Sequence, residues 1–329
     1  MFKEQVLETI KKYNLIQQND KIVCAVSGGP DSICMLDILR KIKEEKQINF
    51  DIIVCHINHL IREEATADEQ YVENYCQKYE IPFFVRRVDV KKIAETNKQG
   101  TEEAGRKVRY DFFEEIFQKE NATKIAIAHN KNDKIETIIM NVFRGSGISG
   151  LRGIEPIRDN KFIRPLIETE RTEIEKYCED NRLKPRIDKT NFINDVTRNK
   201  IRNIVIPYIK NEFNPNFINT LDRLSNVITE EDEYMKKKTA EIYNKIKIRE
   251  QDGFIILNLK EFNKQEEVIR KRLILLAITK AIGNAQNIEK VNIEDIIKLC
   301  SNNIGNKYLT PNKNIKISVG KGQVMFEKK

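Results

Sequence analysis

The sequence predicts an α/β protein with a parallel sheet in its first part and a mainly helical second part. Short runs rich in Val and Ile alternate with longer segments whose apolar residues recur at helical spacing, the pattern of βαβ units. A length of 329 residues suggests about two domains. The formal charge of +8 is uneven, because residues 1–180 carry 29 Lys+Arg against 32 Asp+Glu and the positive excess lies after them. We therefore expect a near-neutral α/β domain followed by a basic one.

Strands and helices of the first domain are predicted in strict alternation. Right-handed crossovers between parallel strands place the carboxyl ends of those strands at one edge of the sheet, where ligands bind. The predicted strands are residues 21–26, 52–57, 83–88 and 124–128, and the predicted helices are residues 32–46, 66–79, 101–119 and 134–143.

Beyond about residue 215 the apolar spacing is mostly helical, and this part has only a short strand-like tail. The Asn-Pro pair at Asn214 and Pro215 suggests the boundary, which gives domains of residues 1–215 and 216–329. The predicted helices are residues 216–248, 264–282 and 293–300, and the tail strands are 315–319 and 323–326. The excess of positive charge suits a polyanionic partner such as a nucleic acid.

Composition and cysteine spacing argue against several classes of protein. The best apolar run, Leu273 to Ile278, is far shorter than the ~20 residues of a membrane helix, and the N-terminus has no signal-peptide core. The six cysteines form no CxxC pair, so we interpret them as buried, reduced thiols of a cytoplasmic protein. Three histidines make a poor ligand set for zinc.

A phosphate-binding loop is predicted where the first strand meets the first long helix, in the hexad Ser27-Gly28-Gly29-Pro30-Asp31-Ser32. Two glycines allow a tight turn and close approach of a ligand, and the helix N-terminus favours an anion. Asp31 is placed to approach Mg²⁺ bound to phosphates. The alternative is a structural turn with Asp31 or Ser32 as the helix N-cap. The hexad resembles the PP-loop of the ATP-pyrophosphatase superfamily, which implies that residues 27–32 hold the pyrophosphate end of ATP.

Polar residues follow the second and fourth predicted strands at the same edge of the sheet. His56 and Asn58 end the second strand together with His59, and we expect hydrogen bonds to a nucleotide there rather than a metal pair. His129 follows the fourth strand, and Asp133 and Glu136 then share one face of a helix. Two such carboxylates can hold a cation or take a proton from an amine, although helix capping would also explain them.

Two pairs of arginines are spaced to share a helical face. Arg106 and Arg109 suit phosphate or carboxylate recognition, with a solvated helix and a Glu102–Arg106 ion pair as the alternative. Arg198 and Arg202 lie in the basic connector, where contact with nucleic-acid phosphates is natural, and a solvated helix is again the alternative.

Taken together, these segments resemble the tRNA(Ile)-lysidine synthetase family. The resemblance is close over residues 20–215 and looser to about 320. It rests on the PP-loop and five further motifs: His56-Ile-Asn-His-x-x-Arg62, Ala104-x-Arg-x-x-Arg-Tyr110, Ala128-His-Asn-x-x-Asp-x-x-Glu-Thr137 with Arg144-Gly-Ser-Gly-x-x-Gly-Leu-x-Gly153, Asp188-x-Thr-Asn191 and Arg198-Asn-x-Ile-Arg202.

The resemblance implies a two-step reaction with ATP and Mg²⁺ as cofactors. ATP adenylates the C2 oxygen of the wobble cytidine in isoleucine tRNA with a CAU anticodon, and the ε-amine of free L-lysine then displaces AMP. Implied catalytic residues are Asp133, Glu136, Arg106 and Arg109; implied ATP ligands are Ser27, Gly28, Gly29, Pro30, Asp31, Ser32, His56, Asn58 and His129; implied tRNA contacts are Arg144, Arg198, Asn199 and Arg202. The implied Mg²⁺ ligand is Asp31, through the ATP phosphates.

The chain departs from the family pattern in two ways. Many members have His where Asn130 stands and Asp where Asn132 stands, so neither position is given acid–base chemistry. Many members also have a further C-terminal domain, for which this chain is too short. The main alternative is a PP-loop tRNA thiolase, although the thiolases usually use reactive cysteines or CxxC pairs. A non-catalytic nucleotide-binding module, an amidotransferase-type synthetase and a homodimeric state also stay open.

Overall fold

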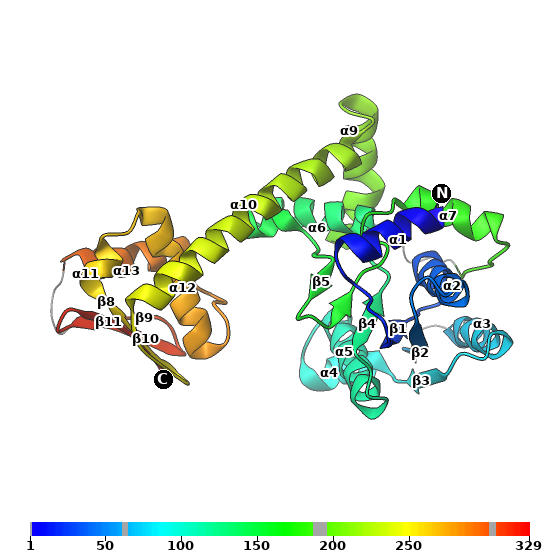
Figure 1. Cartoon of the computed structure of the whole chain (residues 1–329), viewed down its shortest axis with the longest axis horizontal. Helices are drawn as coiled ribbons and strands as arrows, with labels where there is room; N and C mark the ends of the chain where they lie inside the picture. Colours follow the sequence, from blue (N-terminus) through cyan, green and yellow to red (C-terminus); the bar gives the residue numbers. More distant parts are fainter. Residues whose placement is uncertain (1, 61–64, 187–195, 303–306) are drawn as a thin grey trace. The chain divides into compact units, whose positions relative to one another are not determined.

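The computed structural model describes the chain except for residues 1, 61–64, 187–195 and 303–306. It divides into two compact units, Met1–Asn226 and Val227–Lys329 (Figure 1). All six cysteines are buried free thiols, as their spacing predicted. Within the described residues, none of the helices is both long and apolar enough to span a bilayer.

The first unit is built on a six-stranded sheet in the order β3-β2-β1-β4-β6-β5. Its first five strands in that order run parallel, and β5 pairs antiparallel with β6. The chain moves outward from β1 through β2 to β3 and then returns to place β4 on the other side of β1. This reversal creates the switch point at which open α/β sheets bind ligands. The strands are β1 (Asp20–Ala25), β2 (Phe50–Asn58), β3 (Phe83–Arg87), β4 (Lys124–Ile127), β5 (Ile157–Arg158) and β6 (Phe162–Ile163).

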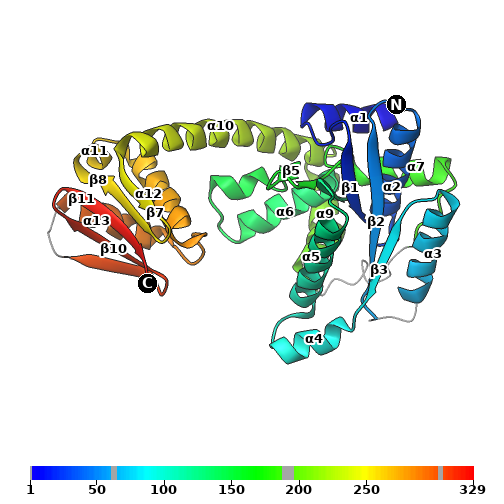
Figure 2. The ribbon, with the colours of Figure 1, turned by 60° about the horizontal axis from the view of Figure 1, so that its bottom comes forward.

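Helices cover both faces of this sheet, which explains why its strands are continuous apolar runs. Ile22 and Cys24 of β1 pack in one core with α1 (Phe2–Lys12), α2 (Pro30–Glu44), α3 (Ala65–Lys78) and α7 (Arg171–Asp180). Val23 points to the opposite core, which contains Phe112, Phe113 and Ile116 of α5 (Thr101–Lys119). Figure 2 shows α2 and α3 on one side of β1–β3 and α5 on the other.

The sequence prediction of this unit is confirmed for its first four strands and the four long helices. The fourth of those helices, α6 (Lys131–Phe143), begins slightly earlier than predicted. The prediction missed β5 and β6, which have only two residues each. The unit's other helical segments are α4 (Val90–Asn97), η1 (Ile148–Arg152), α8 (Thr197–Lys200), the π-helical turn η3 (Ile201–Val205), α9 (Ile206–Glu212) and the first part of α10 (Phe217–Ile246).

The division between the units falls within α10 rather than at Asn214 and Pro215. The start of α10 packs on the first unit, where Ile218 joins an apolar cluster with Ile135 and Ile138 of α6. Lys134 Nζ also lies 2.8 Å from Asp222 Oδ1. The Asn-Pro pair therefore marks the turn before a helix and not the end of the first unit.

The second unit is mainly helical, as predicted, and also has an antiparallel sheet in the order β7-β8-β11-β10-β9. The predicted tail strands are β10 (Ile315–Gly320) and β11 (Gln323–Lys328). The sequence prediction missed β7 (Lys247–Gln251), β8 (Phe254–Asn258) and β9 (Tyr308–Asn312). β7 is a mostly exposed edge strand with a single apolar residue and therefore no apolar alternation. The remaining helices are α11 (Leu259–Asn263), α12 (Glu267–Ile282) and α13 (Lys290–Asn302).

Candidate active site

The loop between β1 and α2 is held by its own two serines. Ser32 Oγ accepts from the Ser27 amide at 3.1 Å and donates to the Gly29 carbonyl at 3.0 Å, and the two hydroxyls lie 3.2 Å apart. Gly28 has φ +93°, a backbone conformation that residues other than glycine rarely adopt. The helix begins at Pro30 after Gly29, which provides no side-chain cap, so the alternative of Asp31 or Ser32 as N-cap is wrong. The loop opens the N-terminus of α2 to a ligand.

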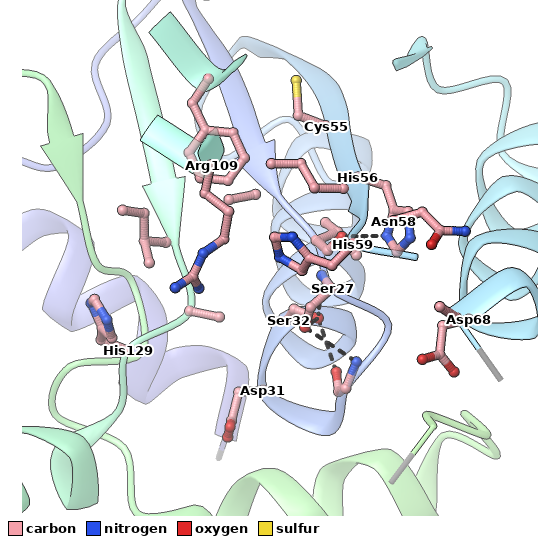
Figure 3. A pocket seen from close by; sticks show the side chains of 18 residues that line it. Ser27, Asp31, Ser32, Cys55, His56, Asn58, His59, Asp68, Arg109 and His129 are labelled. Carbon is pink, nitrogen blue, oxygen red and sulfur yellow. Dashed lines mark hydrogen bonds between the residues drawn. The ribbon is translucent and has the colours of Figure 1, made fainter. Parts of the chain in front are cut away.

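A pocket of about 520 Å³ lies at the carboxyl ends of β1, β2 and β4 (Figure 3). Its size is within the range of small-molecule sites. It contains most of the nucleotide ligands proposed from sequence, and it adds Asp68 of α3, which the sequence did not indicate. The side chains of the predicted set that line it are Ser27, Asp31, Ser32, His56, Asn58, Arg109 and His129.

His56 and Asn58 lie in the pocket wall, and protein groups occupy much of their hydrogen-bonding capacity. His56 Nδ1 is 2.8 Å from the Val26 carbonyl oxygen, and burial lowers the pKa of this imidazole, so the ring is neutral. Asn58 Nδ2 donates to Glu69 at 2.9 Å, and Asn58 Oδ1 accepts from the Leu60 amide at 3.0 Å. Through these bonds Asn58 ties β2 to α3, and it also lines the pocket.

Asp31 lines the pocket and contacts the N-cap residue of α6. Asn130 Nδ2 donates to Asp31 Oδ1 at 2.9 Å, and Arg171 Nη2 lies 3.9 Å from Asp31 Oδ2. Burial and the nearby Asp133 raise the pKa of Asp31, against the lowering effect of Arg171 and Asn130. A divalent cation at the Asp31 carboxylate would offset the repulsion between Asp31 and Asp133. No three described His, Cys, Asp or Glu residues cluster to hold a metal. A cation at Asp31 would therefore take its further ligands from other oxygens, such as those of phosphates and waters.

Asp133 and Glu136 of α6 are ion-paired with Arg198 and Arg202. Glu136 is only 1% exposed and accepts from Arg198 Nε at 2.8 Å, Arg202 Nε at 2.6 Å and Arg202 Nη2 at 2.8 Å. Asp133 Oδ1 lies 3.1 Å from an Nη2 of each arginine. Asp133 also forms a capping box with Asn130, so the capping alternative is realised alongside the ion pairs.

This pairing changes the interpretation of Arg198 and Arg202. The sequence suggested that they grip tRNA phosphates, but in this structure their guanidinium groups contact the predicted catalytic carboxylates. Buried carboxylates require partners because an unpaired buried charge is costly. The two arginines come from α8 and η3, and the 62-residue separation of Arg198 from Glu136 made the contact invisible in the sequence.

Arg106 and Arg109 of α5 are the site's unpaired arginines. Both are exposed, and neither has an ion-pair partner within 4 Å among the described carboxylates, so the Glu102–Arg106 alternative is not realised there. Arg109 lines the pocket and donates to the Gly105 carbonyl at 3.3 Å. Arg106 stacks on Tyr110 at 4.9 Å.

His129 lies at the end of β4 and receives a hydrogen bond from a residue that the sequence did not single out. Arg164 Nε donates to His129 Nδ1 at 3.0 Å. Burial, followed by the charges of Arg164, Arg198, Arg106 and Arg109, lowers the pKa of His129 to about 3. This histidine is therefore neutral at physiological pH.

The remaining predicted residues lie outside the pocket or outside the described residues. Arg144 is exposed as the C-cap of α6, and Asn199 is half-buried in α8. Gly153 has φ +66°, and a Cβ there would meet Ile138 at 2.9 Å, so this glycine is needed for close packing on α6. The Asp188-x-Thr-Asn191 motif and Arg62 lie outside the described residues.

Comparison with known proteins identifies the family. A PP-loop domain model matches residues 1–209. The tRNA(Ile)-lysidine synthase of Clostridium acetobutylicum is 46% identical over 308 residues, which cover 93% of this chain and 66% of that protein. The tRNA(Ile)-lysidine synthase of Clostridioides difficile is 43% identical, with 96% of this chain and 68% of that protein covered. The chain thus spans about two thirds of the length of these curated relatives.

A solved structure supports the fold. The U34-tRNA thiolase of Methanococcus maripaludis aligns with a TM-score of 0.58 over 70% of this chain and 78% of its own, at 21% identity. From the domain match and the two synthases, the chain belongs to the tRNA(Ile)-lysidine synthase family of PP-loop proteins.

Proposed function

We propose that this protein uses ATP to join L-lysine to C2 of the wobble cytidine in isoleucine tRNA with a CAU anticodon. The observation that carries the proposal is the position of Asp133 and Glu136. In a chain of this family, these buried carboxylates follow directly on the strand that ends at the nucleotide pocket, with Asn130 joining Asp133 to Asp31.

ATP is proposed to bind with its phosphates on the loop of residues 27–32. The N-terminus of α2 would stabilise the negative charge of the leaving pyrophosphate. Arg109 would contact the same phosphates; in support, it lines the pocket and has no ion-pair partner among the described carboxylates. Asp31 would hold Mg²⁺, which supplies charge neutralisation to the phosphates when it is bound.

The first step is attack by the C2 oxygen of cytidine on the α-phosphorus of ATP, which releases pyrophosphate. In the second step the lysine ε-amine attacks C2, and AMP leaves with the oxygen. The ε-amine is protonated in water near neutral pH, so a carboxylate must orient it and accept its proton. We assign that work to the pair of Asp133 and Glu136.

The arginine contacts impose an order on these events. Arg198 and Arg202 occupy the oxygens of Glu136, so a lysine ammonium group reaches that carboxylate only if the guanidinium groups shift. Phosphates of bound tRNA are the natural competing partners for arginine. We propose that tRNA, which would also contact Arg144 and Asn199, draws these arginines away before lysine enters.

The test is incorporation of radiolabelled lysine into isoleucine tRNA, with Glu136→Gln and Asp133→Asn as the variants. Both should lose lysidine formation while calorimetry still detects Mg-ATP binding. Glu175→Gln, an exposed glutamate on α7, is the matched control and should keep full activity. Full activity in both site variants would reject the assignment of the carboxylates.

A further inference from the structure

Three histidines line the nucleotide pocket, and the hydrogen bonds of two of them, His56 and His129, require opposite ring tautomers. We propose that Arg164 is a positioning residue, which fixes His129 as a neutral ring with its proton on Nε2, so that His129 donates a hydrogen bond to a phosphate oxygen of the bound nucleotide. The hydrogen bond from His129 to a phosphate rests on the proposed function. The assignment of the His129 tautomer depends only on contacts within the protein.

The tautomer of His129 follows from the chemistry of its partner. A guanidinium group has only N–H donors and no acceptor. Arg164 Nε lies 3.0 Å from His129 Nδ1, so Nδ1 must present its lone pair. Arg164 is 4% exposed and also donates to the Glu155 carbonyl, which keeps it in place. With Nδ1 as the acceptor, the proton of the neutral ring sits on Nε2.

The surroundings of His129 keep the ring neutral. Guanidinium groups face it from three places, Arg164 after β6, Arg198 on α8, and Arg106 with Arg109 on α5. Burial of the ring disfavours its protonated form most strongly, and each guanidinium group adds to this by repelling a positive charge on the imidazole. Together they lower the pKa of His129 to about 3. His129 is therefore a fixed donor and not a general base at Nε2.

The free donor belongs to the pocket. His129 lines it, and Nε2 has no hydrogen-bond partner in the part of the chain that the structure describes. Figure 3 shows His129 on the same side of the pocket as Arg109, and Asp31 lines the same pocket. A donor near Arg106 and Arg109, which have no ion-pair partner among the described carboxylates, suits an anionic oxygen. The loop of residues 27–32 lines the same pocket. The geometry therefore favours the phosphate over the base.

His56 provides an internal control in the same pocket. Its Nδ1 lies 2.8 Å from the Val26 carbonyl oxygen, which can only accept. Nδ1 of His56 must therefore carry the proton, and its Nε2 is bare. The chain has three histidines, so ¹⁵N spectra of the imidazoles contain few signals.

The first experiment is ¹⁵N NMR of the histidine side chains in the nucleotide-free protein at pH 7. Signals are assigned with His56→Gln, His59→Gln and His129→Gln variants. We expect a protonated Nε2 and a bare Nδ1 for His129, and the reverse for His56. A protonated Nδ1 in His129, or protons on both of its nitrogens, would overturn the proposal without any assumption about the reaction.

The second experiment titrates AMP and adenosine while the His129 Nε2–H signal is followed. A shift with AMP but not with saturating adenosine supports the phosphate contact, and equal shifts, or none with bound AMP, overturn it. Calorimetry with Mg-ATP separates this from failure of the proposed function. A protein that binds no nucleotide would reject nucleotide use, while the tautomer result would stand.

The third experiment tests Arg164 itself. With Arg164→Met, both neutral tautomers of His129 should be populated, and the pKa of His129 should rise towards its ordinary value. AMP binding should weaken by on the order of tenfold. That weakening should vary between pH 5 and 8, whereas Arg164→Lys should restore a fixed tautomer. Arg158→Met, on the same hairpin, is the control and should change neither the ¹⁵N signals of His129 nor the affinity for AMP. Loss of binding that is equal at every pH, with the tautomer intact, would show that Arg164 is only structural.

Discussion

Removal of Arg202 tests whether the buried carboxylates are held by arginines in solution. Arg202→Met keeps an apolar stem and deletes the guanidinium group. Glu136 then loses two of the three hydrogen bonds that Arg198 and Arg202 donate to it. Glu136 is 1% exposed, so in the intact protein its charge is balanced by these arginines rather than by solvent.

The expected cost can be worked from this geometry. Removing one partner of a buried ion pair costs about 3–5 kcal/mol. Arg198 stays in contact with Glu136, and the Arg202 side chain is 20% exposed, so we expect a smaller loss, about 2–3 kcal/mol. In a unit of this size each kcal/mol lowers Tm by roughly 2–4 °C. The predicted fall in Tm is thus about 4–12 °C.

The assay is a double-mutant cycle by urea unfolding, with Glu136→Gln as the second change. The double variant should be more stable than the sum of the single effects predicts, with a coupling of about 1–3 kcal/mol. Arg223→Met, an exposed arginine of α10, should change stability by less than ~0.5 kcal/mol and serves as the control. Single variants as stable as this control, with additive effects, would refute the ion-pair cluster.

The loop of residues 27–32 and helix α2, which follows it, each allow a further prediction. Gly28→Ala should destabilise the protein by about 1–2 kcal/mol, because Gly28 has φ +93°. Gly29→Ala is the control and should leave the midpoint of urea unfolding unchanged, because its added Cβ would meet nothing closer than 3.6 Å. Equal urea midpoints for the two variants would contradict this account of the turn. Burial alone would raise the pKa of Asp37, but hydrogen bonds, chiefly from Tyr177 and Arg40, hold it below its ordinary value. The stabilisation that ionised Asp37 provides is therefore present above about pH 4 and lost as the pH falls further. Asp37→Asn should lower stability at pH 7 and flatten the acid side of a plot of unfolding free energy against pH. An unchanged acid side of that plot would contradict the prediction.

The first unit could be predicted closely because its strands are buried on both faces. Such strands are continuous apolar runs, as in 52–57, and they contrast with the helices between them. Short or charged strands such as β6 and β7 carry no such signal, since pairing with neighbours holds them in the sheet rather than their own pattern.

The candidate site could be predicted in its residue types but not in its contacts. The loop of residues 27–32 is local, so its sequence alone indicates its conformation. The pairing of Glu136 with Arg202 and of His129 with Arg164 joins distant segments, and these contacts form only when the strands and helices pack. From the sequence we therefore predicted that Arg202 contacts tRNA phosphates, whereas in this structure its guanidinium group pairs with two buried carboxylates.

The most direct test of the central claim is stoichiometry in one reaction mixture. The protein is incubated with ATP, Mg²⁺, labelled L-lysine and isoleucine tRNA with a CAU anticodon, and tRNA-bound lysine, AMP and pyrophosphate are measured together. We predict equal amounts of all three, and no tRNA-bound lysine without ATP or with the anticodon cytidine replaced. A protein that binds Mg-ATP and this tRNA but transfers no lysine, or that transfers lysine without forming AMP, would contradict the proposed function.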